Sequence, residues 1–181
     1  MIKNSRGFTL IEVTIAMALL VMAFGGLMGL LTLTQEAKVS GKNNATATYL
    51  AQEGLDLVRM IRDENYNEGP NNPTPSDVFN QIFDISGTSY SFTVDYRGQT
   101  SLAVPAAGTT VKSSTPLYVL NNFYTYNIVA SSRQTIFRRL ITTTYFPAAS
   151  PPYLKVTSEV FWQFDNKRNT VTLQDELTAW R

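Results

Sequence analysis

The stretch Lys3-Asn4-Ser5-Arg6-Gly7-Phe8-Thr9-Leu10-Ile11-Glu12-Val13 decides how the rest of the chain is organised. A short basic leader ends at Gly7, and a long apolar run with an early carboxylate, Glu12, begins at Phe8. About twenty apolar helical residues, at about 1.5 Å each, cross a bilayer core of about 30 Å. From Val13 to Leu31 only one residue is polar, so this stretch predicts a membrane-spanning helix.

Glu12 is an unusual residue for such a helix. An ionised carboxylate costs about 2.5–3.5 kcal/mol at the centre of a membrane helix and less toward the interface. Two interpretations stay open. Glu12 either lies among the lipid headgroups and reaches water, or it pairs with a cation on the same chain or on a neighbouring one.

Three ordinary kinds of N-terminal segment compete for this stretch. A secretory signal peptide has an uninterrupted apolar region and a small-residue cleavage site, whereas Glu12 interrupts this region and the run is long for a signal. A plain signal anchor fits the length but gives no reason for Gly7-Phe8 or for Glu12. A lipoprotein needs a cysteine, and the chain has none.

The motif Gly7-Phe8-Thr9-Leu10-Ile11-Glu12-Val13 resembles the processing site of type IV pilins and pseudopilins. The resemblance implies that a prepilin peptidase cuts between Gly7 and Phe8 on the cytoplasmic side and then methylates the new amine of Phe8. It also implies that Glu12 neutralises the terminal amine of a neighbouring subunit during assembly, so Phe8 and Glu12 are the expected assembly residues. A softer likeness to minor pilins of the pilus-modification type lies in Leu50–Gly54 together with Arg59 and Arg62-Asp63.

The resemblance also sets the location and the partners. Two cations precede the apolar run and two follow it (Lys3, Arg6, Lys38 and Lys42), so charge alone does not orient the helix. The family pattern places the leader in the cytoplasm and the bulk of the chain outside the bacterial inner membrane, as a single-pass protein that later enters a surface or periplasmic filament. The implied partners are other pilin or pseudopilin subunits, the prepilin peptidase, an inner-membrane assembly platform and membrane lipid.

Composition excludes several classes of function. The chain of 181 residues has neither cysteine nor histidine, so disulfide bracing and any site that depends on these residues are excluded. The formal net charge is +1, which argues against strong nucleic-acid binding. No grouping of carboxylates, lysines, serines and tyrosines indicates a catalytic site, so the sequence predicts neither an enzyme nor a cofactor.

The helix is expected to continue beyond the membrane as far as about Asn65. Apolar residues spaced by four and three define one face of this amphipathic second half: Ala47, Leu50, Ala51, Gly54, Leu57, Val58 and Ile61. Glycine, proline and asparagine then end the helix. Three glycines in the first half, Gly25, Gly26 and Gly29, favour close helix packing. The resemblance to pilins implies local unwinding on assembly as the alternative, and the sequence leaves both open.

After the helix the hydrophobic period changes to two, which is typical of half-buried strands. The pattern predicts strands at 90–97, 117–120, 123–130 and 137–146, and a final hairpin of 154–164 and 170–174 around a turn at 165–169. Phe161 falls among the polar residues of that hairpin. A short helix capped by Ser76 or Asp77 and running to Ile82 is expected, with a strand nearly as well supported, and Gly98–Pro116 reads as a long exposed loop.

These patterns together predict an α+β fold, in which a long N-terminal helix packs against an antiparallel β-sheet. The expected parts are a leader (1–7), a transmembrane and assembly helix (8–35) and a pilin-like head (36–181). A membrane-anchored, adhesin-like binding module is the alternative function. Two weaker groups, the tyrosines Tyr118, Tyr124 and Tyr126 and the calcium-type oxygens of Asp165, Asn166 and Asn169, are better explained by strand packing and by a turn.

Overall fold

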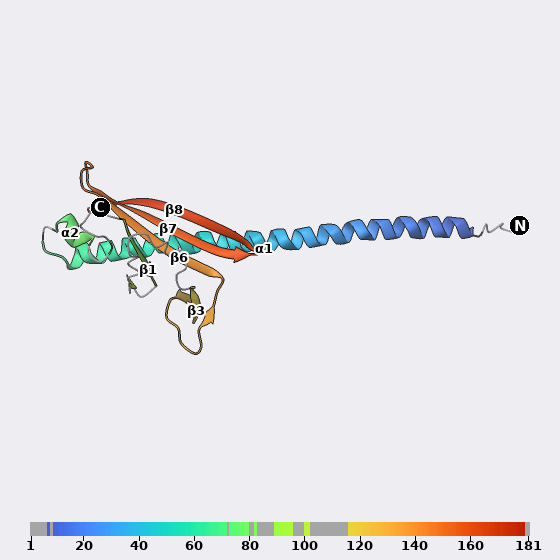
Figure 1. The fold of residues 1–181 in the computed structure, drawn as a ribbon, viewed down its shortest axis with the longest axis horizontal. Coiled ribbons are helices and arrows are strands. Elements are labelled where there is room, and N and C mark those ends of the chain that lie inside the picture. Colours follow the sequence, from blue (N-terminus) through green and yellow to red (C-terminus); the bar gives the residue numbers. More distant parts are fainter. Residues whose placement is uncertain are drawn as a thin grey trace, which may run out of the picture. The chain divides into compact units, whose positions relative to one another are not determined.

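A computed structural model of the chain describes residues 7, 9–71, 73–79, 82, 89–95, 100–101 and 116–179. The chain divides into two compact units, Met1–Asn43 and Asn44–Arg181. Helix α1 (Leu10–Glu68) contributes its first part to one unit and its second part to the other. Figure 1 shows the helices and strands of both units.

In the N-terminal unit, every described side chain of α1 from Leu10 to Lys42 is exposed. The large apolar side chains here keep between 41% (Val39) and 84% (Leu10) of their surface accessible. The unit includes a helical segment that is long and apolar enough to cross a membrane, and none of that segment is buried. The predicted transmembrane segment is therefore helical, and its apolar surface is not covered by any other described part of the chain.

In the head unit, α1 buries the face that the sequence predicts. The residues at the predicted spacing are all buried, and Leu55 joins them. The helix ends at Glu68, three residues later than expected. The N–H of Gly69 then donates to the carbonyl oxygen of Asn65 at 3.0 Å, and a Cβ at Gly69 would lie only 2.8 Å from that oxygen, so a glycine suits this close approach.

Two antiparallel sheets follow. The larger has the order β2-β1-β6-β7-β8 and comprises β1 (Tyr90–Val94), β2 (Thr100–Ser101), β6 (Phe137–Phe146), β7 (Tyr153–Phe164) and β8 (Lys167–Thr178). The smaller has the order β4-β3-β5 and comprises β3 (Tyr118–Leu120), β4 (Phe123–Thr125) and β5 (Arg133–Gln134). Figure 1 shows β6, β7 and β8 running alongside the head part of α1, while the sheet around β3 stands to one side. The predicted α+β architecture is confirmed.

The head has two apolar clusters that share α1 as a common wall. The first joins the helix to α2 (Pro75–Val78) and the large sheet: Leu55, Leu57, Val58, Ile61, Val78, Phe79, Ile82, Phe92, Val94, Ile141, Leu154, Val156, Leu177 and Ala179. The second joins the helix to the ends of β6 and β7 and to the residue before β3: Ala47, Leu50, Ala51, Leu117, Phe137, Val160 and Trp162. On the helix, Gly54 falls between the residues of the two clusters.

Several local predictions need correction. The short helix is α2, which ends at Val78 rather than Ile82, and its cap is Thr74. Thr74 and Asp77 form a reciprocal capping box, a pattern in which each side chain accepts a hydrogen bond from the other residue's backbone N–H. The strand expected at 123–130 ends at Thr125, because the Thr125 side chain turns to Asp95 and accepts from the N–H of Asn127.

The second group of corrections concerns loops and the last hairpin. Thr100–Ser101, inside the predicted loop Gly98–Pro116, pairs with β1, and positions 102–115 of that loop lie outside the described residues. The hairpin turn has two residues rather than five: Asp165 and Asn166 take φ of 49° and 56°, which asparagine and aspartate tolerate well. Phe161 is buried beneath the guanidinium of Arg168, although the sequence places it with polar residues.

Candidate processing and assembly segment

The predicted cleavage position lies just before the start of α1. Gly7 is exposed and outside regular structure, and no atom lies within 4 Å of the position that its Cβ would take. Phe8, the predicted new N-terminus and methylation site, lies outside the described residues. On the glycine side, the junction is therefore open to an enzyme.

Thr9 and Glu12 together build the first turn of α1. The Glu12 N–H donates to the Thr9 carbonyl oxygen at 3.1 Å and to the Thr9 hydroxyl at 3.4 Å. Thr9 therefore acts as the N-cap, and Glu12 occupies the third helical position, where a carboxylate is favoured by the helix dipole. This cap was not among the predictions from the sequence, although Thr9-Leu10-Ile11-Glu12 has the spacing of a capping box.

Glu12 also borders an apolar groove on the helix surface. The groove has a volume of about 440 Å³ and is lined by Glu12, Val13, Ala16, Met17 and Leu20. The Glu12 side chain is exposed and makes no ion pair with another described residue. One carboxylate therefore lies at the end of an uncovered apolar groove. A second apolar helix could fill this groove if it carried a cation at the level of Glu12.

The glycines of the first half do not break the helix in the single chain. α1 is continuous through Gly25, Gly26 and Gly29, and nothing lies within 4 Å of a Cβ built at any of them. The Thr32 hydroxyl donates to the Gly29 carbonyl oxygen at 2.8 Å. The helix surface at all three positions is therefore open to close packing by another helix.

The head contains a buried polar cluster that was not predicted from the sequence. Arg138 and Arg139 point to opposite faces of β6 as predicted, but Arg139 is completely buried. Its guanidinium donates to the carbonyl oxygens of Leu50 (3.0 Å) and Val94 (2.7 Å), and its Nη1 lies 3.6 Å from the Glu53 carboxylate. Arg139 thereby ties together α1, β1 and β6. The sequence signal that could have revealed this buried cluster is an arginine within a strand that is mostly apolar and rich in threonine.

Tyr126 extends this cluster toward the smaller sheet. Its hydroxyl donates to the backbone carbonyl oxygen of Arg139 at 2.8 Å. Burial raises the pKa of Tyr126 to about 12, against the opposing effect of the nearby Arg139 charge. Tyr118 lies opposite Thr125 and Tyr124 lies opposite Val119, so Tyr118 and Tyr124 face opposite sides of the sheet and no single tyrosine stripe exists there.

The turn residues that could have suggested a calcium site have a conformational explanation. Asp165 and Asn166 occupy the positive-φ positions of the β7–β8 hairpin, which accounts for their residue types. Among the described residues, no group of three or more Asp or Glu side chains is placed to hold a metal ion.

The described part of the chain combines a capped, uncovered apolar helix that has a carboxylate in its first turn with a second half of the same helix that packs on an antiparallel sheet. Residues 2–28 match the model of the prokaryotic N-terminal methylation motif, so the chain carries the type IV pilin and pseudopilin signature. This signature supports a pilin-like subunit that is processed by prepilin peptidase. No curated protein and no solved structure shows a significant match to the chain.

Proposed function

We propose that the protein is a structural subunit, a minor pilin or pseudopilin, of a bacterial type IV pilus or a related secretion or DNA-uptake filament. The observation that carries this proposal is the first part of α1. It combines the methylation motif, a fully exposed apolar surface and, within that apolar stretch, a single carboxylate, Glu12, which makes no ion pair with a described residue. A plain membrane stem would need the apolar surface but not the carboxylate.

The proposed sequence of events follows from these features. Lipid covers the apolar surface of α1 while the head lies outside the inner membrane. Peptidase cleavage after Gly7 frees the amine of Phe8, which stays cationic when it is methylated once. The subunit then leaves the membrane by exchanging lipid for the helices of neighbouring subunits. Head-to-tail contacts of this kind do not close on themselves, so they generate a filament.

Glu12 has a defined part in this exchange. A carboxylate that leaves the headgroup region for an apolar helix bundle is costly unless it meets a cation. The amine of Phe8 on a neighbouring subunit supplies that cation and fixes the axial register of the two helices. The amine of the same chain, four residues away, is the competing partner.

The N-terminus of the mature protein tests the proposal. Mass spectrometry of the protein from membranes and from sheared surface material of the native host should show loss of residues 1–7 and one methyl group on Phe8. A Gly7→Val variant should keep its leader and stay in the membrane fraction. An intact leader in the wild-type protein, or a cut beyond Leu31 as in a signal peptide, would overturn the proposal.

A further inference from the structure

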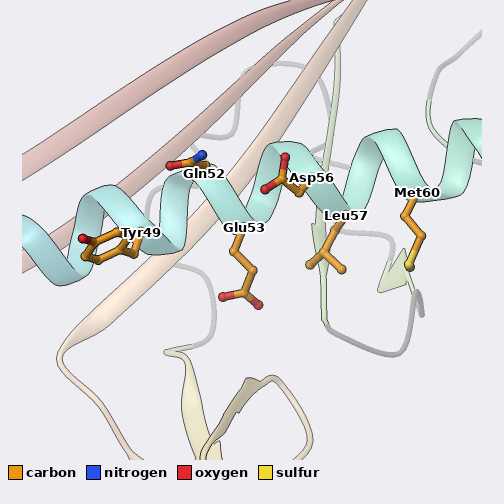
Figure 2. Close-up of a pocket in the computed structure, with 6 residues that line it drawn as sticks. All are labelled: Tyr49, Gln52, Glu53, Asp56, Leu57 and Met60. Carbon is orange, nitrogen blue, oxygen red and sulfur yellow. The ribbon is translucent and has the colours of Figure 1, made fainter. Parts of the chain in front are cut away.

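One side of α1 in the head carries a surface groove that borders the first apolar cluster at Leu57. It has a volume of about 470 Å³ and is lined by Tyr49, Gln52, Glu53, Asp56, Leu57 and Met60. Figure 2 shows the side chains of Glu53, Leu57 and Met60 leaving the same side of the helix. Tyr49 keeps 73% and Met60 42% of their surface exposed, so large apolar groups border the groove in contact with solvent. We call this surface the helix groove.

The helix groove is acidic. A second hollow of about 670 Å³ continues it toward the end of α1 and adds Asp63, Glu64 and Glu68 to its lining. Between Tyr49 and Glu68 the helix carries five carboxylates and two arginines, and both arginines already pair with aspartates. Glu64 and Glu68 make no ion pair with any described residue, so no described cation neutralises these two carboxylates.

The smaller sheet presents a surface of the opposite character. The segment 126–132 joins β4 to β5, and a turn in which the Ser132 N–H donates to the Val129 carbonyl oxygen (2.9 Å) shapes its tip. Ile128 keeps 64% and Val129 40% of their surface exposed. Arg133, directly after the turn, is exposed and makes no ion pair with a described residue. From 117 to 137 the chain has no carboxylate, and Arg133 is its only charge.

We propose that this loop tip, 128–133, docks in the helix groove of a second copy of the chain. The two surfaces match in kind, because each combines exposed apolar side chains with unpaired charge and the charges are opposite. None of the residues that line the groove comes from the loop of the same chain. Pairing the apolar parts removes water from both, and Arg133 then meets the carboxylates around Glu64 in a partly dry contact, where ion pairs are stronger than at an open surface.

A contact between the loop tip of one copy and the helix groove of another has a geometric consequence. The loop and the groove are different patches of one head, so their contact is heterologous, and repeating it leaves one free patch at each end. The contact would therefore join heads in an open series, which goes beyond the helix packing of the proposed function. It involves neither the leader nor Glu12, so it can succeed or fail independently of processing.

Disulfide cross-linking tests the contact cleanly, because the chain has no cysteine of its own. Full-length Val129→Cys and Met60→Cys variants are produced separately and together in the membrane and are oxidised mildly. Co-production should give a cross-linked dimer, and the Val129→Cys, Met60→Cys double variant should give a ladder of multimers. Each single variant alone should stay monomeric. A Thr172→Cys partner, exposed on β8, replaces Met60→Cys as the matched control and should give no dimer.

Charge reversal then tests the role of Arg133. Arg133→Glu or Glu64→Arg should each lower the yield of the Val129–Met60 cross-link several-fold, and the two together should restore it. Absence of the mixed cross-link, efficient dimers of a single variant, or a photoreactive group at Val129 that labels only lipid would each overturn the inference. If the processed protein enters sheared filaments but the cross-link does not form, only the head contact is contradicted. If the cross-link forms but the leader is not removed, only the proposed function is contradicted.

Discussion

Arg139 reaches across from the sheet to the helix and donates from Nη1 to the backbone carbonyl oxygen of Leu50 at 3.0 Å. A second hydrogen bond from Nη2 reaches the carbonyl oxygen of Val94 at 2.7 Å. The approach depends on Gly54, since a Cβ at Gly54 would lie 3.0 Å from Cδ of Arg139 and 2.6 Å from Oγ of Ser158. One arginine and one glycine thus set how closely α1 lies on β6 and β7.

Replacing Arg139 should therefore destabilise the head. Arg139→Met keeps most of the side-chain volume but removes two hydrogen bonds from a charged donor, and we expect the free energy of unfolding to fall by about 2–4 kcal/mol. Denaturant unfolding of the full chain in detergent, followed by tryptophan fluorescence, measures it. Glu53→Gln is the control: the Glu53 carboxylate lies 3.6 Å from the arginine and its side chain is 34% exposed, so its neutralisation should cost less than the loss of the arginine. Equal losses for the two variants would contradict this account.

Gly54→Ala should also destabilise the head, although alanine is the better helix former by about 1 kcal/mol. The added methyl group would displace Ser158 and Arg139, and overpacking of this kind costs about 1–3 kcal/mol. Gly41→Ala, in the same helix but with nothing within 4 Å of its Cβ, is the matched control and should be neutral or stabilising. The same unfolding measurement compares them, and a stabilised Gly54→Ala protein would show that the close approach is not a constraint.

The hydrophobic period of the sequence predicts which residues of a helix or strand are buried, but not every contact that they make. The buried positions of α1 follow from spacing alone, and β6 has the bounds that its run of β-branched and aromatic residues predicts. The burial of Arg139 does not follow from spacing, because it depends on which backbone carbonyls three separate elements bring together. Phe161 was misplaced for a similar reason: strict alternation cannot anticipate that Arg168 of the next strand covers its ring.

Stability should fall in alkaline solution through Tyr126. Burial raises its pKa from 10.0 in the unfolded chain to about 12 in the folded one. Between these values the unfolded state releases the phenol proton while the folded state retains it, so the free energy of unfolding decreases as the pH rises, by up to about 1.4 kcal/mol per pH unit. Below pH 10 this contribution is fully present.

The Tyr126→Phe variant isolates this effect. It should be less stable than the wild type near neutral pH, because the hydrogen bond to the Arg139 carbonyl oxygen is lost, and it should lack this part of the alkaline decline. Unfolding free energies measured at several pH values from 9 to 12 for both proteins provide the comparison. Parallel curves for the two proteins would show that Tyr126 titrates normally.

For the N-terminal segment, the sequence predicted the location of the functional motif but not its local geometry. Glycine, phenylalanine, glutamate and the apolar run lie within one short motif, so local sequence is enough to mark the segment. Its local geometry was not foreseen: Thr9 caps the helix and Glu12 completes its first turn, which gives Glu12 a role within its own chain. The partner of Glu12 could not be predicted, because it depends on assembly rather than on the fold of one chain.

The incorporation of a Glu12→Gln variant into filaments tests the central claim most directly. Glutamine also suits the third position of a capped helix, so the start of α1, membrane insertion, cleavage and head stability should be preserved. Removing the charge should reduce the amount of the protein in sheared filaments relative to the membrane fraction, as measured by quantitative immunoblotting. Glu36→Gln, exposed on the same helix, is the control and should assemble like the wild type. A Glu12→Gln protein that enters filaments at the wild-type level would contradict the account, because Glu12 would then be only an interfacial residue.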